Sequence, residues 1–404
     1  IRWSLESAKE QLCDKAKAVN SRFIVLDPNG EYSKAFSDKT DAKLYTVNLE
    51  AEDKKRQLEV PLWFWNTDEW CGFTKASPKT HRTTIVHALK SVKSGIVFEQ
   101  LSKQRELASY VRTVIDTIEI NKATGSPWGK FPLPKNFHTS VEKWTSGINS
   151  DENYSEELKN AIQTFKIKAK ELIDARTGMY PHYDYTKAEV DSLIILLKNV
   201  YAKAGGREED FLPIDEDSPI TFTGENFIRA IEANAEILNT TDYIVTLMPR
   251  IKALLTDVRV KKVIDNENLN LGEWLDSYIG SDNKESLTII DLSLLPSEVT
   301  GIITAVIARM VFEAQQRYLK LNKQCLPTVL VMEEAHYFIK RYNDDAENIG
   351  PATQCCKVFE KIAREGRKFG LGLVLSSQRP SELSPTVLSQ CNSCLLYTSP
   401  SPRD

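Results

Sequence analysis

An α/β fold built on a parallel sheet is predicted by three features of this chain. Short strands alternate with long amphipathic helices over its last third. The strands are almost entirely apolar, as strands are when helices cover both faces of a sheet. Acidic and polar residues directly follow several of the strands, where ligand sites of parallel sheets lie.

The alternation is clearest after residue 286. Apolar strands are expected at 287–292, 327–332 and 372–377, and amphipathic helices at 296–321 and 353–369. Strands that alternate with helices in this order join through right-handed crossovers and pair in parallel. Two further strands, at 22–27 and 44–47, are expected in the same sheet although they lie far earlier in the chain.

The middle of the chain is predicted to be helical, because apolar residues recur there at i, i+3 and i+4. The helical segments are 84–120, 155–175, 187–204, 224–238 and 243–263. Segments rich in Pro, Gly, Ser or acidic residues separate them. We therefore expect one large helical subdomain inserted into the sheet domain.

This organisation divides the chain into four parts. Residues 1–76 form the first part of the sheet domain, 77–285 the inserted helical subdomain, and 286–393 the second part of the sheet domain. A helix is also expected within residues 5–19. The last part, 394–404 (CLLYTSPSPRD), resembles the translation of a sequencing-library adapter and is left out of the fold prediction.

Residues 58–71 carry three tryptophans and have two possible interpretations. They pack as the aromatic core of the first domain, or they stack on nucleic-acid bases. The density of large aromatic side chains favours the core.

Composition is that of an ordinary globular protein, with 41% hydrophobic and 27% charged residues and a formal net charge of −4. This net charge does not indicate a large basic surface. The seven cysteines form no CxxC pair and no metal-ligand spacing with the five histidines, which indicates a reducing, cytoplasmic compartment. Neither a signal peptide nor a run of 18 apolar residues occurs, so no membrane association is expected.

Two adjacent carboxylates, Glu333 and Glu334, follow the strand at 327–332. Nucleoside-triphosphate hydrolysis requires an acid that holds magnesium and a group that orients the attacking water. Adjacent strand positions point to opposite faces, so the two acids should have different roles. We expect Glu333 to bind magnesium and Glu334 to orient water. His336 either contacts this site or forms a structural hydrogen bond, which is the commoner role of a lone histidine.

Polar and cationic residues follow in the next helix and strand. Arg364 and Arg367 are spaced i, i+3 and share a helix face, where they contact phosphate or form surface ion pairs. Gln378, at the end of the strand at 372–377, suits a sensor of phosphate or water. Arg379 beside it either binds nucleotide or is structural.

The segment DPNGE at residues 27–31 follows the first strand. This sequence is typical of a tight turn. Its place at a strand end also makes Asp27 and Glu31 candidate nucleotide-binding residues. No GxxxxGK[ST] phosphate-binding loop occurs within the 404 residues.

Four segments resemble the HerA-type ATPases of the FtsK–HerA group, which are ring-forming, usually hexameric DNA translocases with a RecA-like core. The segments are FIVLDPNGEYSKAF, IIDLSLLPSEV, VLVMEEAHYFIK and KIAREGRKFGLGLVLSSQRPSELSPTVLSQCN. The resemblance covers roughly residues 20–65 and 285–393, and the helical middle matches in general character. It implies a RecA-like sheet with a helical insertion.

The resemblance also implies roles for individual residues. Glu333 would be the Walker B acid, Glu334 the catalytic glutamate, and Gln378 the sensor. Arg364 or Arg367 would be the arginine finger that reaches a neighbouring subunit's nucleotide. The family's phosphate loop precedes its first helix, so we expect it, together with a β-barrel domain, upstream of Ile1, and we expect residues 1–404 alone to be inactive.

The implied cofactors are ATP and Mg²⁺. The implied function is that of a hexameric double-stranded DNA translocase or helicase that works with a nuclease or another effector in DNA end processing or phage defence. A protein-translocating ATPase of the type IV secretion or conjugation kind shares the same core and is the alternative. The sequences REGRKFG and SQRPSELSPTVLSQ favour the DNA motor.

Overall fold

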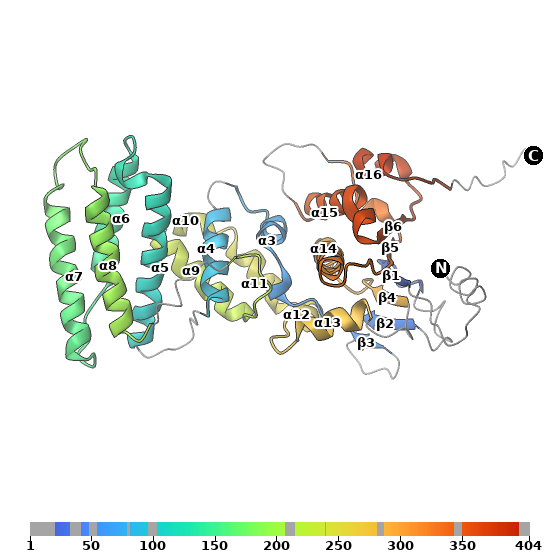
Figure 1. The fold of residues 1–404 in the computed structure, drawn as a ribbon, viewed down its shortest axis with the longest axis horizontal. Helices are drawn as coiled ribbons and strands as arrows, with labels where there is room; N and C mark the ends of the chain where they lie inside the picture. The colour runs from blue at the N-terminus through green and yellow to red at the C-terminus, as the bar shows by residue number, and fades with distance from the viewer. Residues whose placement is uncertain are drawn as a thin grey trace, which may run out of the picture. The chain divides into compact units, whose positions relative to one another are not determined.

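The computed structural model describes residues 21–32, 42–47, 55–78, 81–95, 103–206, 215–238, 240–280, 287–342 and 350–395. The helix expected within residues 5–19 lies outside these ranges. The chain forms two compact units: residues 1–77 together with 250–404, and residues 78–249. The first unit contains the sheet, and the second is helical (Figure 1).

Six strands form one parallel sheet in the order β3-β2-β4-β1-β5-β6. The strands are β1 (Arg22–Asp27), β2 (Ala42–Thr46), β3 (Arg56–Gln57), β4 (Leu287–Asp291), β5 (Thr328–Met332) and β6 (Leu371–Leu375). The predicted α/β fold with a parallel sheet is confirmed. Strand β6 ends two residues earlier than expected, which leaves Ser376 and Ser377 beyond the strand.

Apolar burial explains why β1 takes the centre of the sheet. Val25 and Leu26 are completely buried, and Ile24 is nearly so. Because β1 pairs with both β4 and β5, neither of its edges is open, and its central residues are apolar, as in a sheet with both faces covered. Helices α14 (Ser297–Asn322) and α15 (Pro351–Glu365) pack against each other in the same unit.

The tryptophan-rich segment forms η1 (Leu62–Phe64) and α3 (Thr67–Thr74). Its three tryptophans, Trp63, Trp65 and Trp70, are all at most 2% exposed. The aromatic-core interpretation is therefore confirmed, because buried rings have no face free to stack on a base.

A buried ion pair fastens this aromatic segment to α14. Arg309 binds Glu69 through two bonds, Nε to Oε1 at 2.7 Å and Nη2 to Oε2 at 2.9 Å. It also donates to the carbonyl of Phe64 at 2.6 Å and to Glu313 at 3.1 Å. Glu69 in turn completes a capping box with Asn66 at the start of α3. The carboxylates beside Arg309 raise the pKa of its guanidinium. Burial raises the pKa of Glu69, and the contact with Arg309 opposes that rise.

The helical unit contains a bundle made of α5 (Lys103–Thr124), α6 (Leu133–Gly147), α7 (Glu156–Asp174) and α8 (Lys187–Lys203). Helices α4 (His81–Lys93), α9 (Gly224–Ile237) and α10 (Thr241–Ile244) complete the unit, and α4 packs on α9. The bundle core is a continuous cluster of buried aliphatic and aromatic side chains. The periodicity of the sequence thus predicted α7, α8 and α9 to within a residue or two.

Three expectations about the helices were wrong. Residues 84–120 are not one helix, since α4 ends at Lys93 and α5 begins at Lys103. No helix was expected between residues 120 and 155, yet α6 lies there with Pro134 in its first turn, where proline is well tolerated. Residues 243–263 form three helices, α10, α11 (Met248–Thr256) and α12 (Val258–Ile264), because Pro249 and the capping residue Asp257 start new ones.

The boundary of the helical unit also differs from the expected 285. Residues from 250 onward, including α13 (Leu271–Tyr278), group with the sheet. The reason is aromatic packing: the Tyr278 ring stacks on Tyr45 of β2 at a centroid distance of 4.1 Å. The indole of Trp274 donates to the carbonyl of Glu59 at 2.7 Å.

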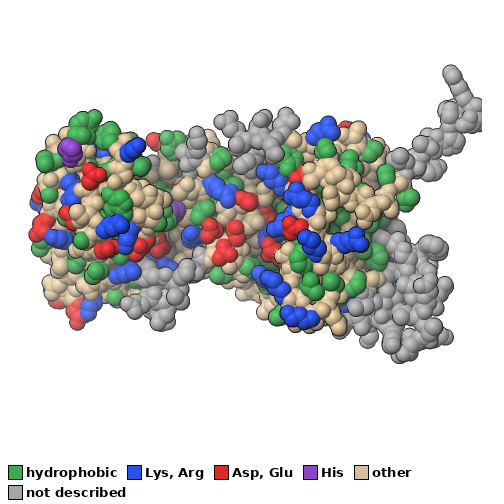
Figure 2. All heavy atoms as spheres, turned by 45° about the horizontal axis from the view of Figure 1, so that its top comes forward, with side chains coloured by type: hydrophobic (Ala, Val, Ile, Leu, Met, Phe, Trp, Pro, Cys, Tyr) green, Lys and Arg blue, Asp and Glu red, His purple; other side chains and the backbone are tan. Residues whose placement is uncertain are grey.

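Charges of both signs are interspersed over each unit on the face drawn in Figure 2. This distribution agrees with the small net charge of the chain. Among the described helices, none is both long enough and apolar enough to cross a bilayer.

The Glu69–Arg309 pair gives a stability prediction. Replacing Arg309→Met should lower the free energy of unfolding of the sheet unit by about 3–5 kcal/mol, because Glu69 is left buried without its cation. Urea unfolding followed by tryptophan fluorescence measures the change, since three tryptophans lie beside the pair. Arg317→Met, on the exposed side of the same helix, is the matched control and should change stability by less than about 0.5 kcal/mol. Equal stability of the two variants would contradict the structural role of the pair.

Candidate active site

The carboxyl ends of β1, β4, β5 and β6 meet at one edge of the sheet. Asp27 is in register with Asp291, Leu26 with Met332, and Met332 with Leu375. The chain segments that follow these strands therefore emerge side by side. The two glutamates, the aspartates and Gln378 all emerge at this edge, as the sequence predicted for residues that follow parallel strands.

Backbone hydrogen bonds continue past the end of β5 and hold the glutamate segment from both sides. The amide of Glu333 donates to the carbonyl of Leu26 at 3.2 Å. On the other side, the amide of Ala335 donates to the carbonyl of Ser376 at 2.8 Å. The position of both glutamates is thus fixed by main-chain contacts to β1 and to the segment after β6.

Glu333 receives two side-chain hydrogen bonds from neutral donors. The hydroxyl of Tyr32 donates to Oε2 at 2.8 Å, and that of Ser376 donates to Oε1 at 2.9 Å. Burial, together with the bond to Glu333, raises the pKa of Tyr32 to about 12, so the phenol stays protonated and remains a donor. Sequence reasoning missed both donors, although Tyr32 ends the DPNGEY segment and Ser376 follows β6 directly.

Glu334 has an unusual backbone conformation. Its φ of 46° and ψ of 45° lie in the left-handed region, which costs a residue with a side chain about 1–3 kcal/mol. The expectation that the two glutamates occupy opposite faces of one strand was wrong, because β5 ends at Met332. The chain instead turns at Glu334 into the 3-10 helix η4 (Ala335–Tyr337), and this turn separates the two carboxylates.

Glu334 is buried, with 8% of the residue exposed, and one oxygen of its carboxylate accepts a hydrogen bond. Gln378 Nε2 donates to Oε1 at 2.7 Å. Oε2 accepts no hydrogen bond from the described residues. The Nδ1 atom of His336 lies 3.1 Å from Oε2 but forms no hydrogen bond with it, and it lies 3.2 Å from the hydroxyl of Ser377. His336 therefore contacts Glu334 and also forms a hydrogen bond with Ser377, so both roles considered for it, a contact with the site and a structural hydrogen bond, occur together.

The carboxylate of Asp27 accepts hydrogen bonds from backbone amides of the turn that follows it. Its Oδ1 accepts the amides of Asn29 and Gly30 at 3.1 and 2.9 Å, and its Oδ2 accepts the amide of Tyr32 at 2.8 Å. The side chain is completely buried. Asp27 thus shapes the loop that delivers Tyr32 to Glu333, whereas Glu31 is exposed.

Gly30 lets this turn approach β4. Its φ is 73°, and a Cβ at this position would lie 3.0 Å from the hydroxyl of Ser293 and 3.2 Å from both carboxylate oxygens of Asp291. Any side chain here would push the turn away from the end of β4.

The three arginines are on the surface. Arg364 ends α15 and Arg367 lies in η5 (Gly366–Phe369); both are exposed, and neither forms a hydrogen bond or ion pair within the described part of the chain. Arg379 is also exposed and pairs with Glu382 at 3.2 Å. The structure does not bring any of them into contact with Glu333 or Glu334.

The carboxylates suit a magnesium ion that arrives with a nucleotide. In the described ranges no cluster of three or more metal-ligating side chains occurs. Magnesium bound to nucleotide needs no such cage, because one or two carboxylates and phosphate oxygens with water complete its shell. Glu333, partly exposed and bonded to neutral donors, and the unbonded Oε2 of Glu334 fit that requirement.

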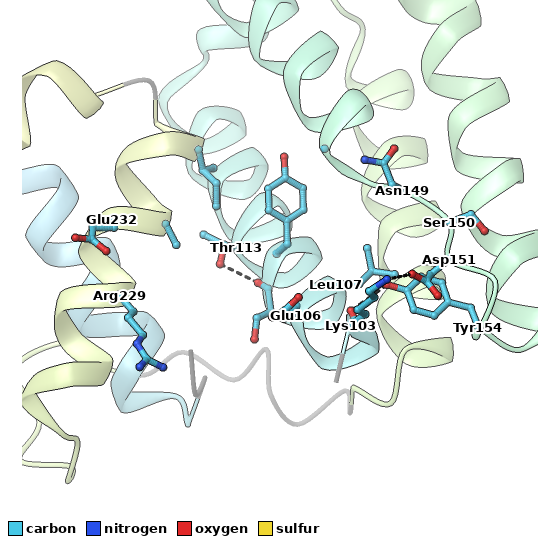
Figure 3. A pocket seen from close by; sticks show the side chains of 15 residues that line it. Lys103, Glu106, Leu107, Thr113, Asn149, Ser150, Asp151, Tyr154, Arg229 and Glu232 are labelled. Carbon is cyan, nitrogen blue, oxygen red and sulfur yellow. Dashed lines mark hydrogen bonds and ion pairs between the residues drawn. The ribbon is translucent and has the colours of Figure 1, made fainter. Parts of the chain in front are cut away.

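A separate cavity of about 580 Å³ lies in the helical unit (Figure 3). Residues of α5, of the α6–α7 connection and of α9 line it. Two of its charges, Lys103 and Asp151, neutralise each other at 2.5 Å. None of the residues predicted from the sequence as catalytic or nucleotide-binding lines this cavity.

A six-stranded parallel sheet flanked by helices is consistent with an α/β fold of the RecA-like class. A family model described as the central domain of helicase HerA matches residues 9–200. Over these residues the chain is similar to the HerA-type family.

Curated relatives agree with the family. The DNA double-strand break repair helicase HerA of Pyrococcus furiosus is 40% identical over 78 residues, which is 19% of this chain and 13% of the relative. The protein of the same name from Sulfolobus acidocaldarius is 31% identical over 121 residues, 29% of this chain and 23% of the relative. The protein of the same name from Saccharolobus solfataricus is 28% identical over 148 residues, which is 36% of this chain and 27% of the relative. The match thus spans about a quarter or less of each relative's length.

The turn after β1 yields a prediction that separates a structural from a nucleotide-binding role. Asp27→Asn should lower the free energy of unfolding by about 1–3 kcal/mol, because an NH2 group then replaces Oδ2 and cannot accept the hydrogen bond from the backbone amide of Tyr32. Chemical denaturation checks this value. Glu31→Gln, an exposed change in the same turn, should leave stability unchanged. If Asp27→Asn keeps full stability, the turn does not depend on the carboxylate, and direct nucleotide contact becomes the better explanation for Asp27.

Proposed function

We propose that this chain supplies the carboxylate half of an ATP-driven DNA translocase or helicase. The observation that carries the proposal is the arrangement of Glu334. Its Oε1 is held by Gln378, while the buried Oε2 is left without a hydrogen bond. A buried acceptor without a partner is costly, and such an atom is suited to accept a proton from water.

The roles of the side chains follow from their contacts. Glu334 orients the attacking water through Oε2, and Gln378 fixes the rotation of the carboxylate from the side of β6. Glu333 holds magnesium, which supplies charge neutralisation for the phosphates when it is bound. Tyr32 and Ser376 fix the Glu333 carboxylate without cancelling its charge, because both donors are neutral.

The exposed arginines suit action across a subunit boundary. A finger that acts in trans must be exposed and free of partners on its own subunit, and Arg364 and Arg367 meet both conditions among the described residues. Arg379, held by Glu382, is better suited to a contact with nucleotide or to a structural role. We therefore propose a homo-oligomeric ring, of six subunits by likeness to the family.

The substrate proposed is double-stranded DNA, with a nuclease or other effector as partner and the cytoplasm as compartment. The names of the HerA relatives, which describe repair of DNA double-strand breaks, support this choice over a protein-translocating ATPase. Stimulation of ATP hydrolysis in the full-length protein by linear double-stranded DNA decides between the two. No stimulation by DNA would favour the protein-translocating alternative.

Glu334 and Glu333 give the sharpest test of the site. In the full-length protein, Glu334→Gln should keep ATP binding and lower kcat by ~10²-fold or more, because the water loses its acceptor. Glu333→Gln should weaken magnesium-dependent nucleotide binding instead. Steady-state hydrolysis and equilibrium binding of ATP with and without magnesium separate the effects. The opposite pattern would show that the two roles are exchanged.

The arginines give a test of action in trans. Replacing the true finger, Arg364 or Arg367, by alanine should lower hydrolysis by ~10³-fold while assembly and ATP binding persist. Mixing that variant with Glu334→Gln subunits should restore some activity, because an interface can then draw an intact residue from each side. Mixed rings no more active than either variant alone would show that neither arginine acts across an interface.

A further inference from the structure

The segments that follow β5 and β6 are joined to each other beyond the active edge. Lys340 and Leu383 form an antiparallel bridge. The amide of Arg341 donates to the carbonyl of Glu382 at 2.9 Å, and the amide of Ser384 donates to the carbonyl of Ile339 at 2.9 Å. One segment continues from Glu334 and the other from Gln378, so the join links the chains that carry both residues.

A buried glutamate on α15 anchors this join. Glu360 is 7% exposed, and its carboxylate receives the hydroxyl of Ser384 on Oε1 at 2.5 Å and that of Tyr342 on Oε2 at 3.0 Å. No cation pairs with it among the described residues. Ser384 comes from the segment after β6 and Tyr342 from the segment after β5, so a single carboxylate holds both segments.

A carboxylate at this position needs an explanation. Burying an ionised group is expensive unless hydrogen bonds compensate for lost water, and an apolar side chain would pack on the helix at lower cost. What the carboxylate adds is two directional, charge-assisted bonds to two different chain segments. Arg364 lies one helical turn further along the same helix, at i+4 from Glu360.

We propose that Glu360 is a positioning residue for hydrolysis, an inference that rests on the proposed function. Its hydrogen bonds with Ser384 and Tyr342 fix the segments that carry Glu334 and Gln378 relative to α15, the helix that carries Arg364. The hydrogen bond from Gln378 to Glu334 is 2.7 Å long. In this proposal the anchored segments keep that bond intact while nucleotide binds and dissociates. Displacing a catalytic group by about 1 Å can cost ~10²-fold in rate, so this anchor sets turnover more than affinity.

The test uses Glu360→Gln in the full-length protein, a change that keeps the shape of the side chain. We expect kcat to fall by about 10–100-fold, with KM and the affinity for ATP within about twofold of the unsubstituted protein. Hydrogen exchange at the amides of Arg341 and Ser384 should become faster by about tenfold or more, because the join loses its anchor. Glu267→Gln makes the same chemical change at an exposed position and should alter neither quantity.

A second variant covers the case in which Glu360→Gln does not fold. Tyr342→Phe removes one donor and leaves the other bond in place, so a smaller loss in kcat, about 3–10-fold, is expected with KM unchanged. Normal kcat in folded Glu360→Gln, or in Tyr342→Phe if the first variant is unfolded, overturns the positioning role and leaves the proposed function standing. Absence of ATP hydrolysis in the unsubstituted full-length protein overturns the proposed function, and the positioning role with it.

Discussion

The carboxyl edge of the sheet, with its candidate site, depends on the pairing of β1 with strands that come much later in the chain. Phe23 of β1 pairs with Leu287 of β4, and the whole helical unit lies between these two residues in the sequence. Such an insertion is tolerated because the entropy of closing a loop grows slowly with its length. The buried apolar residues Val25 and Leu26 supply the favourable term that brings the strands together. Without this pairing, Tyr32 would not reach Glu333 and the site would not form.

The electrostatics of the edge follow from its donors. The carboxylates of Glu333 and Glu334 accept hydrogen bonds from a phenol, a hydroxyl and an amide, all of them neutral. Neutral donors satisfy lone pairs without neutralising charge, which leaves the acids able to attract a divalent cation. The buried Glu69, by contrast, is fully matched by Arg309. A glutamate that faces a guanidinium therefore has a structural role. A glutamate that faces neutral donors keeps a charge that can bind a cation.

The sequence was sufficient to predict five of the six strands and the position of the two glutamates, because an apolar run followed by acidic residues is a local pattern. The two-residue strand β3 has no such run and was not predicted. The prolines beside α6 and the separation of α4 from α5 were misread, since local periodicity does not report where a helix is interrupted. The contacts of the site could not be predicted for another reason. The bond from Tyr32 to Glu333 joins residues separated by 301 positions, and no sequence pattern encodes such a distance. The left-handed backbone of Glu334 also had no signal, because no glycine marks it.

The left-handed backbone at Glu334 lowers stability at the same residue whose carboxylate Gln378 holds. Glycine adopts positive φ without strain, so exchange of Glu334 for glycine would relieve the conformational cost at this residue. The same exchange would remove the carboxylate that Gln378 holds. Redesign for thermal stability, which favours glycine at such positions, would therefore select against the acidic side chain here. At Glu334, a costly backbone conformation therefore accompanies the oxygen atom that Gln378 holds.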